Sequence, residues 1–113
     1  MDSLDVSQSE VEKAIASLDD SLKNAIRKAK ENIEKFHGSQ LKGEETVETI
    51  PGVRCWRKSV PVDKVGLYIP GGSAPLFSSL LMLGVPAKLA GCREIILCTP
   101  PGKAGHVAAP ILF

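Results

Sequence analysis

The sequence predicts an α/β fold, in which N-terminal helices and a β-ribbon precede a βαβ unit. Residues 1–37 contain neither glycine nor proline, two β-prone segments flank a Pro-Gly dipeptide, and two short apolar runs enclose a helical pattern. A length of 113 residues and a hydrophobic content of 43% suit a folded core and argue against wholesale disorder. We therefore divide the chain into a helical segment (1–40), a β-ribbon and connector (41–63) and the βαβ unit (64–113).

The helical segment is expected to form two helices. Ser7 and Glu10 form an S-x-x-E capping box, which satisfies free N–H groups in the first turn of a helix. Asp19 and Asp20 suit the positive end of a second helix, and Gly38 is expected to stop it. Between them, apolar residues recur at the three- and four-residue steps of a helix face: Leu22, Ile26, Ala29, Ile33 and Phe36.

A β-ribbon is predicted in the middle of the chain. Thr46–Ile50 and Val53–Ser59 are β-prone, and the turn dipeptide Pro51-Gly52 joins them. The alternation of side chains along a strand would place Arg54, Trp56 and Lys58 on one face of this ribbon.

The βαβ unit follows from two apolar runs of strand length, Val65–Ile69 and Glu94–Thr99, with the helical pattern Leu76–Ala90 between them. This spacing predicts a right-handed crossover between parallel strands, the second of them buried. Pro86 is expected to kink or break the helix. A further helix is expected between His106 and Phe113.

The net charge of +1 hides an asymmetry between the two halves of the chain. Residues 1–50 carry 11 acidic and 7 basic side chains, whereas residues 51–113 carry 2 acidic and 7 basic ones. The basic residues around Trp56 are too few to favour a nucleic-acid interface, so a solvated ribbon face is the simpler interpretation.

Several other classes of protein are also disfavoured. No apolar run reaches the roughly 18 residues of a membrane span, and the acidic N-terminus lacks the apolar region of a secretory signal. Three cysteines without metal-ligand spacing fit a reducing compartment better than a disulfide framework. We expect Cys55 and Cys98 to pack as small hydrophobic residues, and Cys92 to be more exposed.

The candidate functional site is the glycine-rich turn from Tyr68 to Pro75. A strand, a glycine-rich turn and a helix together present backbone N–H groups and a helix dipole to an anion. Gly66–Ser73 approaches the phosphate-binding pattern G-x-x-x-x-G-K-[ST], but Gly72 replaces the lysine, and G-x-G-x-x-G is absent. These residues alone leave open a simple tight turn that needs a positive φ.

Four segments, in a fixed order, carry a family resemblance. They are NIEKFH (Asn32–His37), PGVRC (Pro51–Cys55), VGLYIPGGSAPLFSSLLMLGVPAKLAGC (Val65–Cys92) and ILCTPPGK (Ile96–Lys103). Together they resemble the N-terminal part of histidinol dehydrogenase. The resemblance implies an incomplete Rossmann-like unit of the aldehyde-dehydrogenase type over residues 64–113, truncated at its C-terminus.

The resemblance also implies a function. Histidinol dehydrogenase oxidises L-histidinol through L-histidinal to L-histidine with two NAD, as a cytoplasmic homodimer with one catalytic zinc per site. By this resemblance Tyr68 contacts NAD, and Pro70, Gly71 and Gly72 are further candidates in the same turn. The catalytic Glu–His pair and the zinc ligands of the family lie beyond Phe113, so we expect this chain alone to be an inactive N-terminal fragment.

Two alternatives remain. One is a non-catalytic assembly module that uses the apolar stripe from Leu22 to Phe36 as its contact surface. The other is part of a different aldehyde-dehydrogenase-like oxidoreductase, which would carry a catalytic cysteine motif downstream in place of zinc ligands.

Overall fold

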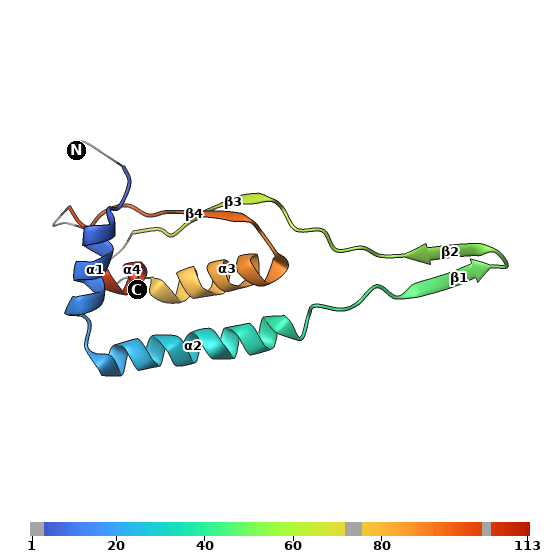
Figure 1. Cartoon of the computed structure of the whole chain (residues 1–113), viewed down its shortest axis with the longest axis horizontal. Helices are drawn as coiled ribbons and strands as arrows, with labels where there is room; N and C mark the ends of the chain where they lie inside the picture. The colour runs from blue at the N-terminus through green and yellow to red at the C-terminus, as the bar shows by residue number, and fades with distance from the viewer. Residues whose placement is uncertain (1–3, 72–75, 103–104) are drawn as a thin grey trace.

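The computed structural model describes residues 4–71, 76–102 and 105–113, and its helices and strands follow the predicted order. A helix from the second half of the chain lies between a two-stranded parallel sheet and the long second helix of the chain. A two-stranded antiparallel ribbon projects away from this body (Figure 1). The elements are α1 (Gln8–Ser17), α2 (Asp20–Gly38), β1 (Thr46–Ile50), β2 (Val53–Trp56), β3 (Lys64–Tyr68), α3 (Phe77–Ala90), β4 (Glu94–Cys98) and α4 (Ala109–Leu112).

The first two helices begin at the predicted capping residues. The Ser7 N–H donates to the Glu10 carboxylate at 2.8 Å, and the Glu10 N–H donates back to the Ser7 hydroxyl at 3.3 Å. At the start of α2, the Leu22 N–H donates to Asp19 Oδ1 at 2.8 Å. Both helices therefore satisfy N–H groups in their first turns with short polar side chains.

The end of α2 differs from the prediction. Gly38 is the last residue of the helix and does not take a positive φ, so it is not a left-handed stop. The Ser39 hydroxyl instead donates to the Phe36 carbonyl at 2.7 Å and satisfies one of the free acceptors of the last turn. The predicted apolar stripe is buried or half-buried up to Ile33, but Phe36 at its end is exposed.

The ribbon of β1 and β2 forms a narrow arm in which every residue from 39 to 64 is exposed. Gly52 supplies its turn with a φ of 85°, and the Gly52 N–H donates to Glu48 Oε1 at 2.7 Å. The second strand ends at Trp56, not at Ser59 as predicted. Trp56 pairs with Thr46, the first residue of β1, so the residues beyond Trp56 have no strand partner.

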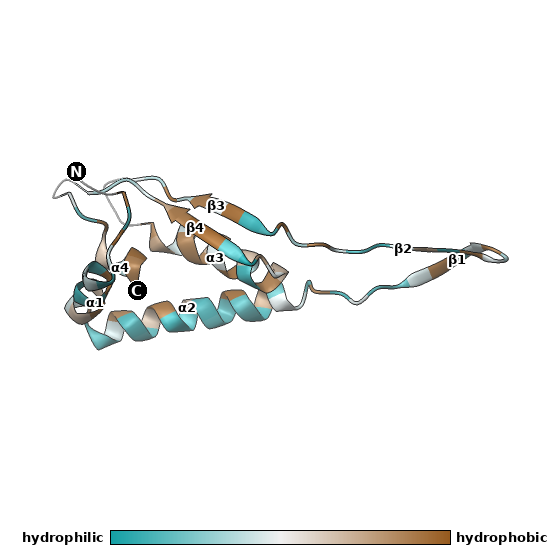
Figure 2. Ribbon diagram, turned by 45° about the horizontal axis from the view of Figure 1, so that its top comes forward, coloured by the Kyte–Doolittle hydropathy of each residue, from teal (hydrophilic) through white to brown (hydrophobic). Residues whose placement is uncertain are grey.

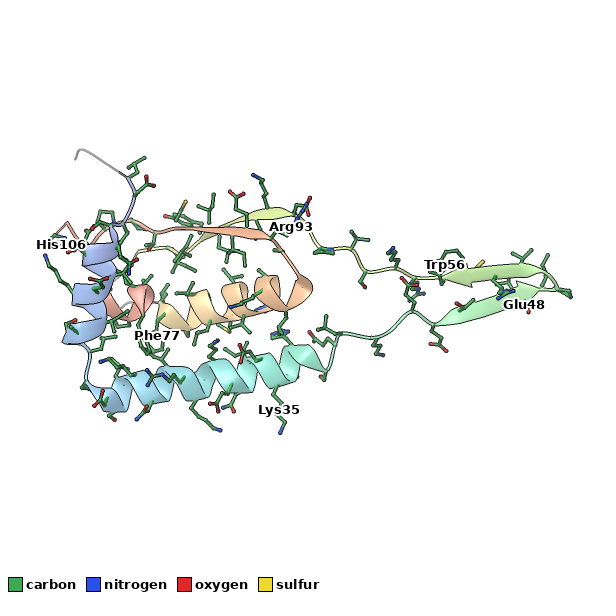
Figure 3. The ribbon with its side chains drawn as sticks, viewed as in Figure 1. Lys35, Glu48, Trp56, Phe77, Arg93 and His106 are labelled. Atoms are coloured by element: carbon green, nitrogen blue, oxygen red, sulfur yellow. The ribbon has the colours of Figure 1, made fainter. Side chains whose placement is uncertain are left out.

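Strands β3 and β4 are parallel, as predicted, and ionic contacts lie where they begin. The Asp63 carbonyl accepts from the N–H groups of Arg93 and Glu94, at 2.9 and 3.0 Å. The Arg93 guanidinium holds the Asp63 carboxylate with two hydrogen bonds of 3.1 and 2.7 Å, and Lys64 pairs with Glu94 at 2.7 Å (Figure 3). These contacts match the observed register, in which Lys64 lies opposite Glu94.

The prediction that the second strand is buried is wrong. Only Leu97 in β4 is half-buried, and the side chain of Ile96 is 55% exposed. The reason is that α3 covers one face of the sheet, and no described residue covers the other (Figure 2). Apolar strands with both faces covered are typical of parallel sheets, and here one of the two layers is lacking.

α3 runs through Pro86 without a break and ends at Gly91, which has a φ of 91°. Pro86 removes the N–H that would donate to the Met82 carbonyl, and Met82 is exposed, so water can satisfy that group. α4 is shorter than predicted because Pro110 is tolerated only in the first turn of a helix. No helix in the described segments is long and apolar enough to cross a membrane.

The molecule is extended. Its radius of gyration is 18.8 Å, compared with about 13 Å for a typical 100-residue domain. Its accessible surface is 8817 Å², whereas a compact protein of this mass exposes about 6000 Å². Among the described residues, the buried hydrophobic side chains are Ile26, Ile69, Val85 and Ile111, and of these Ile69 is fully buried.

Replacement of Gly91 by alanine should destabilise the chain. A left-handed conformation costs an L-residue about 1–2 kcal/mol, so we expect the free energy of unfolding to fall by about this amount. Urea unfolding followed by circular dichroism measures the change. Gly38→Ala is the control, since that helical position has no neighbouring atom within 4 Å and should gain up to about 1 kcal/mol. Equal effects of the two substitutions would contradict the assignment of Gly91 as the helix stop.

Acid should weaken α1 through Glu10. Hydrogen bonds from the Ser7 N–H and then from the Ser7 hydroxyl lower the pKa of the Glu10 carboxyl. A lowered folded-state pKa means that the carboxylate stabilises α1 above its unfolded-state pKa, and that this contribution is lost as the pH falls through the folded-state pKa. We expect Glu10→Gln to flatten the acid titration of the helical circular dichroism signal. Glu12→Gln, which removes the same charge from the same helix, should leave the titration largely unchanged.

Candidate functional site

The candidate site lies at the carboxyl edge of the β3–β4 sheet, where two segments leave the strands side by side. The Ile69 N–H donates to the Cys98 carbonyl at 2.9 Å, so the parallel pairing continues one residue beyond β3. Ile69 is fully buried and anchors the start of the turn. In open α/β sheets, ligands bind at this edge, outside the carboxyl ends of the strands.

Tyr68 is the last residue of β3, and its side chain is 64% exposed. It belongs to the uncovered side of the sheet, which we call the open sheet face. This face comprises Lys64, Gly66, Tyr68, Glu94, Ile96 and Cys98, all of them exposed. No atom lies within 4 Å of the position that a Cβ would take at Gly66. The Tyr68 ring therefore stands beside a low, accessible surface.

The turn that follows Tyr68 is described as far as Gly71. Pro70 and Gly71 are exposed, whereas Gly72 lies outside the described residues. Gly71 does not take a positive φ, so the simple explanation of this glycine as a left-handed turn residue is wrong. A Cβ at Gly71 would instead lie 2.7 Å from Pro100 Cγ, in the segment that follows β4. Space, not backbone conformation, requires the glycine here.

The electrostatic character of this edge favours an anion. Neither Val65–Gly71 nor Ile95–Gly102 contains a charged side chain, so neither segment has a carboxylate that would repel a phosphate. α3 begins after Leu76, which offers no side-chain cap to the first turn. In the first turn the Ser79 N–H donates to the Leu76 carbonyl at 3.0 Å, and the helix dipole favours negative charge at this end.

The cysteines lie differently from the prediction. Cys55 and Cys98 are exposed, and Cys92 is half-buried, which reverses the expected order. Cys98 lies opposite Tyr68 in the register of the sheet. The exposure of these two cysteines follows from the fold. Cys55 lies in the ribbon, which projects as an arm, and Cys98 lies on the open sheet face, which no described residue covers.

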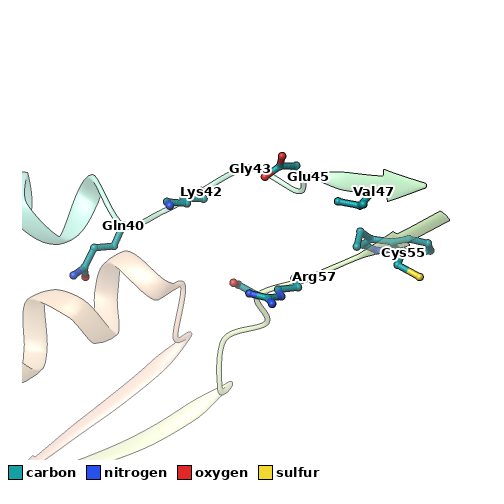
Figure 4. A pocket seen from close by; sticks show the side chains of 9 residues that line it. Gln40, Lys42, Gly43, Glu45, Val47, Cys55 and Arg57 are labelled. Atoms are coloured by element: carbon teal, nitrogen blue, oxygen red, sulfur yellow. The ribbon is translucent and has the colours of Figure 1, made fainter. Parts of the chain in front are cut away.

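Sequence reasoning did not find a hollow at the base of the ribbon, with a volume of about 550 Å³ (Figure 4). Lys42, Glu45, Cys55 and Arg57 are among the residues that line it, and none of the predicted site residues does. The hollow lies between two extended connectors, so it depends on the path of the backbone, which no local motif encodes. Nowhere in the described segments do three metal-ligating side chains come together.

The comparisons with known proteins now identify the family. A family model described as histidinol dehydrogenase matches residues 1–113. The chain belongs to the histidinol dehydrogenase family. The alternative of a different aldehyde-dehydrogenase-like oxidoreductase is therefore rejected.

Individual relatives agree with this assignment. Histidinol dehydrogenase from Bacteroides thetaiotaomicron is 58% identical over 113 residues, which is 100% of this chain and 26% of the relative. Histidinol dehydrogenase from Bacteroides fragilis is 56% identical over 111 residues, 98% of this chain and 26% of the relative. The crystal structure of histidinol dehydrogenase from Elizabethkingia anophelis is 52% identical and matches 99% of this chain and 26% of that chain, with a TM-score of 0.94.

The chain thus spans about a quarter of the length of these histidinol dehydrogenases. The TM-score of 0.94 over 99% of the chain means that this chain has nearly the same overall backbone path as the matching quarter of the Elizabethkingia enzyme.

The exposure of the cysteines can be tested by thiol labelling. In the isolated chain, Cys55 and Cys98 should react quickly with a disulfide reagent, and Cys92 should react more slowly. Three variants that each keep one cysteine, with serine at the other two positions, assign the rates. Faster labelling of Cys92 than of Cys98 would show that the open sheet face is covered in solution.

Proposed function

We propose that this chain supplies an NAD-binding turn to a histidinol dehydrogenase, which oxidises L-histidinol through L-histidinal to L-histidine with two NAD. One observation carries the proposal: in a chain that matches the family over its whole length, an exposed tyrosine and an uncharged turn lie at the carboxyl edge of a parallel sheet.

The residues of this turn fit a dinucleotide. The Tyr68 ring offers a flat, largely apolar surface on which a nicotinamide or adenine ring can lie, and Pro70 adds a second apolar surface. Gly71, together with Gly72 in our assignment, leaves the backbone accessible to a pyrophosphate. NAD, when bound, supplies the hydride acceptor. The part of this chain is to bind and orient the dinucleotide.

The described residues do not fit a zinc site, since no three potential ligands converge among them. We therefore assign the zinc ligands and the catalytic Glu–His pair of the family to the three quarters of the enzyme that lie outside this chain. On this assignment, the chain alone binds no catalytic zinc and does not turn over histidinol. The homodimeric state and the cytoplasmic location implied by the family resemblance belong to the same proposal.

The remainder of the enzyme also accounts for the exposed apolar surface. Ile96 on the open sheet face and Met82 on α3 are both more than half exposed, as are Phe36 and the ribbon residue Trp56. The accessible surface exceeds that of a compact protein by roughly 2800 Å². We propose that other parts of the enzyme cover this surface, so that no separate assembly function is needed to explain it.

The test uses a chimera in which this chain replaces the matching quarter of the Bacteroides thetaiotaomicron histidinol dehydrogenase. The chimera should oxidise histidinol with NAD, whereas the isolated chain mixed with histidinol, NAD and zinc should not. In the chimera, Tyr68→Ala should raise the KM for NAD about tenfold, equivalent to about 1.4 kcal/mol of lost stacking and contact.

Two controls define the result. Tyr68→Phe keeps the ring and should leave the KM for NAD within about threefold of the parent value, since it removes only the hydroxyl. The zinc content and the KM for histidinol should not change in either variant. An unchanged KM for NAD in Tyr68→Ala would refute the cofactor assignment.

A further inference from the structure

Beyond the residues that touch the cofactor, we propose that Pro100 is a positioning residue that holds the NAD-binding turn in place through Gly71. The inference rests on the proposed function, because it concerns how the same turn is held. Pro100 follows β4 and lies outside the turn itself, so its role is structural support from a neighbouring segment.

The Pro100 ring leaves no room for a side chain at position 71. A Cβ at Gly71 would lie 2.7 Å from Pro100 Cγ, 3.7 Å from Pro100 Cβ and 3.9 Å from Pro100 Cδ. Favourable contacts between carbon atoms lie at about 3.5–4.0 Å. The Pro100 ring therefore occupies the space that any side chain at position 71 would need, and the two segments meet as backbone against ring.

Neither segment can easily retreat from this contact. On one side, the Ile69 N–H is bonded to the Cys98 carbonyl, and Ile69 is fully buried. On the other side, Pro100 has a fixed φ and is itself followed by Pro101, which restricts it to extended conformations. The Gly102 N–H donates to the His106 carbonyl at 2.9 Å and secures the far end of the same segment. Pro100 is therefore a stiff support for the turn.

The position of this contact links it to binding. Gly71 lies three residues after Tyr68, and Pro70 lies between them, so the contact sets how far the turn can shift over the edge of the sheet. A side chain at position 71 would push the turn away from β4 and move the groups that receive the dinucleotide. The catalytic groups and zinc ligands that we assign outside this chain would not be moved directly.

The distances also predict a compensating change. Pro100→Ala removes Cγ and Cδ and keeps Cβ, which lies 3.7 Å from the Cβ of an alanine at position 71. This is an ordinary van der Waals distance. The double variant Gly71→Ala/Pro100→Ala should therefore restore the spacing that Gly71→Ala alone disrupts.

The experiment measures NADH binding to the chimera by fluorescence titration, together with the KM for histidinol and the melting temperature. We expect Gly71→Ala to weaken NADH binding at least tenfold, with the KM for histidinol unchanged. Pro100→Ala alone should weaken binding about threefold, because the turn loses its support while position 71 keeps its space, and the double variant should bind NADH about as well as Pro100→Ala. Gly71→Ala/Pro101→Ala is the matched control, and we expect it to show no rescue.

The possible outcomes separate the two proposals. Unchanged NADH binding in Gly71→Ala, or a double variant no better than Gly71→Ala, overturns the role of Pro100 even if the chimera oxidises histidinol. A double variant that loses more than either single variant shows that Pro100 contacts the dinucleotide directly, which also overturns positioning. Rescue of NADH binding in a chimera that does not oxidise histidinol supports the role of Pro100 and counts against the proposed enzymatic function. If Gly71→Ala does not fold, a folded, NADH-binding double variant supports the proposal and an unfolded one overturns it.

Discussion

The parallel pairing of β3 and β4 is the constraint on which the rest of the structure depends. The ionic contacts of Asp63 and Lys64 lie at one end of this pair, and the bond from Ile69 to Cys98 lies at the other. Exposed ion pairs contribute little to stability individually, so the register owes more to the backbone ladder and to the side chains that face α3. Because Tyr68 lies opposite Cys98 in this register, β3 and β4 end at the same edge of the sheet, and the segments that follow them start there side by side.

α3 lies between two larger neighbours and also contacts α4, and these contacts explain its composition. It packs against the sheet on one side and α2 on the other, so apolar residues occur all around it. Among the described residues, the two-stranded sheet has no second layer of helices, and no other helix or strand packs against the ribbon (Figure 2). In the proposal, the geometry of the binding edge depends on two contacts between the segments that follow β3 and β4, those of Ile69 and Pro100.

The sequence predicted those features of the fold that depend on interactions between residues close together in the chain. The capping box of Ser7 and Glu10 and the Pro-Gly turn of the ribbon both act within a few residues, and both are confirmed. The exposure of β4 could not be predicted in this way, because an apolar run has the same composition whether one face or both are covered. The reason for Gly71 was also inaccessible, since it depends on Pro100, which is far along the chain and close only in the fold.

In the proposed function, dinucleotide binding and proton transfer also depend on different kinds of contact. In the proposal, dinucleotide binding depends on backbone geometry at one edge of a small sheet, which this chain builds from its own residues. Proton transfer and zinc binding depend on side chains that must converge from several segments, and the described residues do not bring such a set together. Among the described residues of the turn and of the segment beside it, 68–71 and 99–102, none carries a charged side chain.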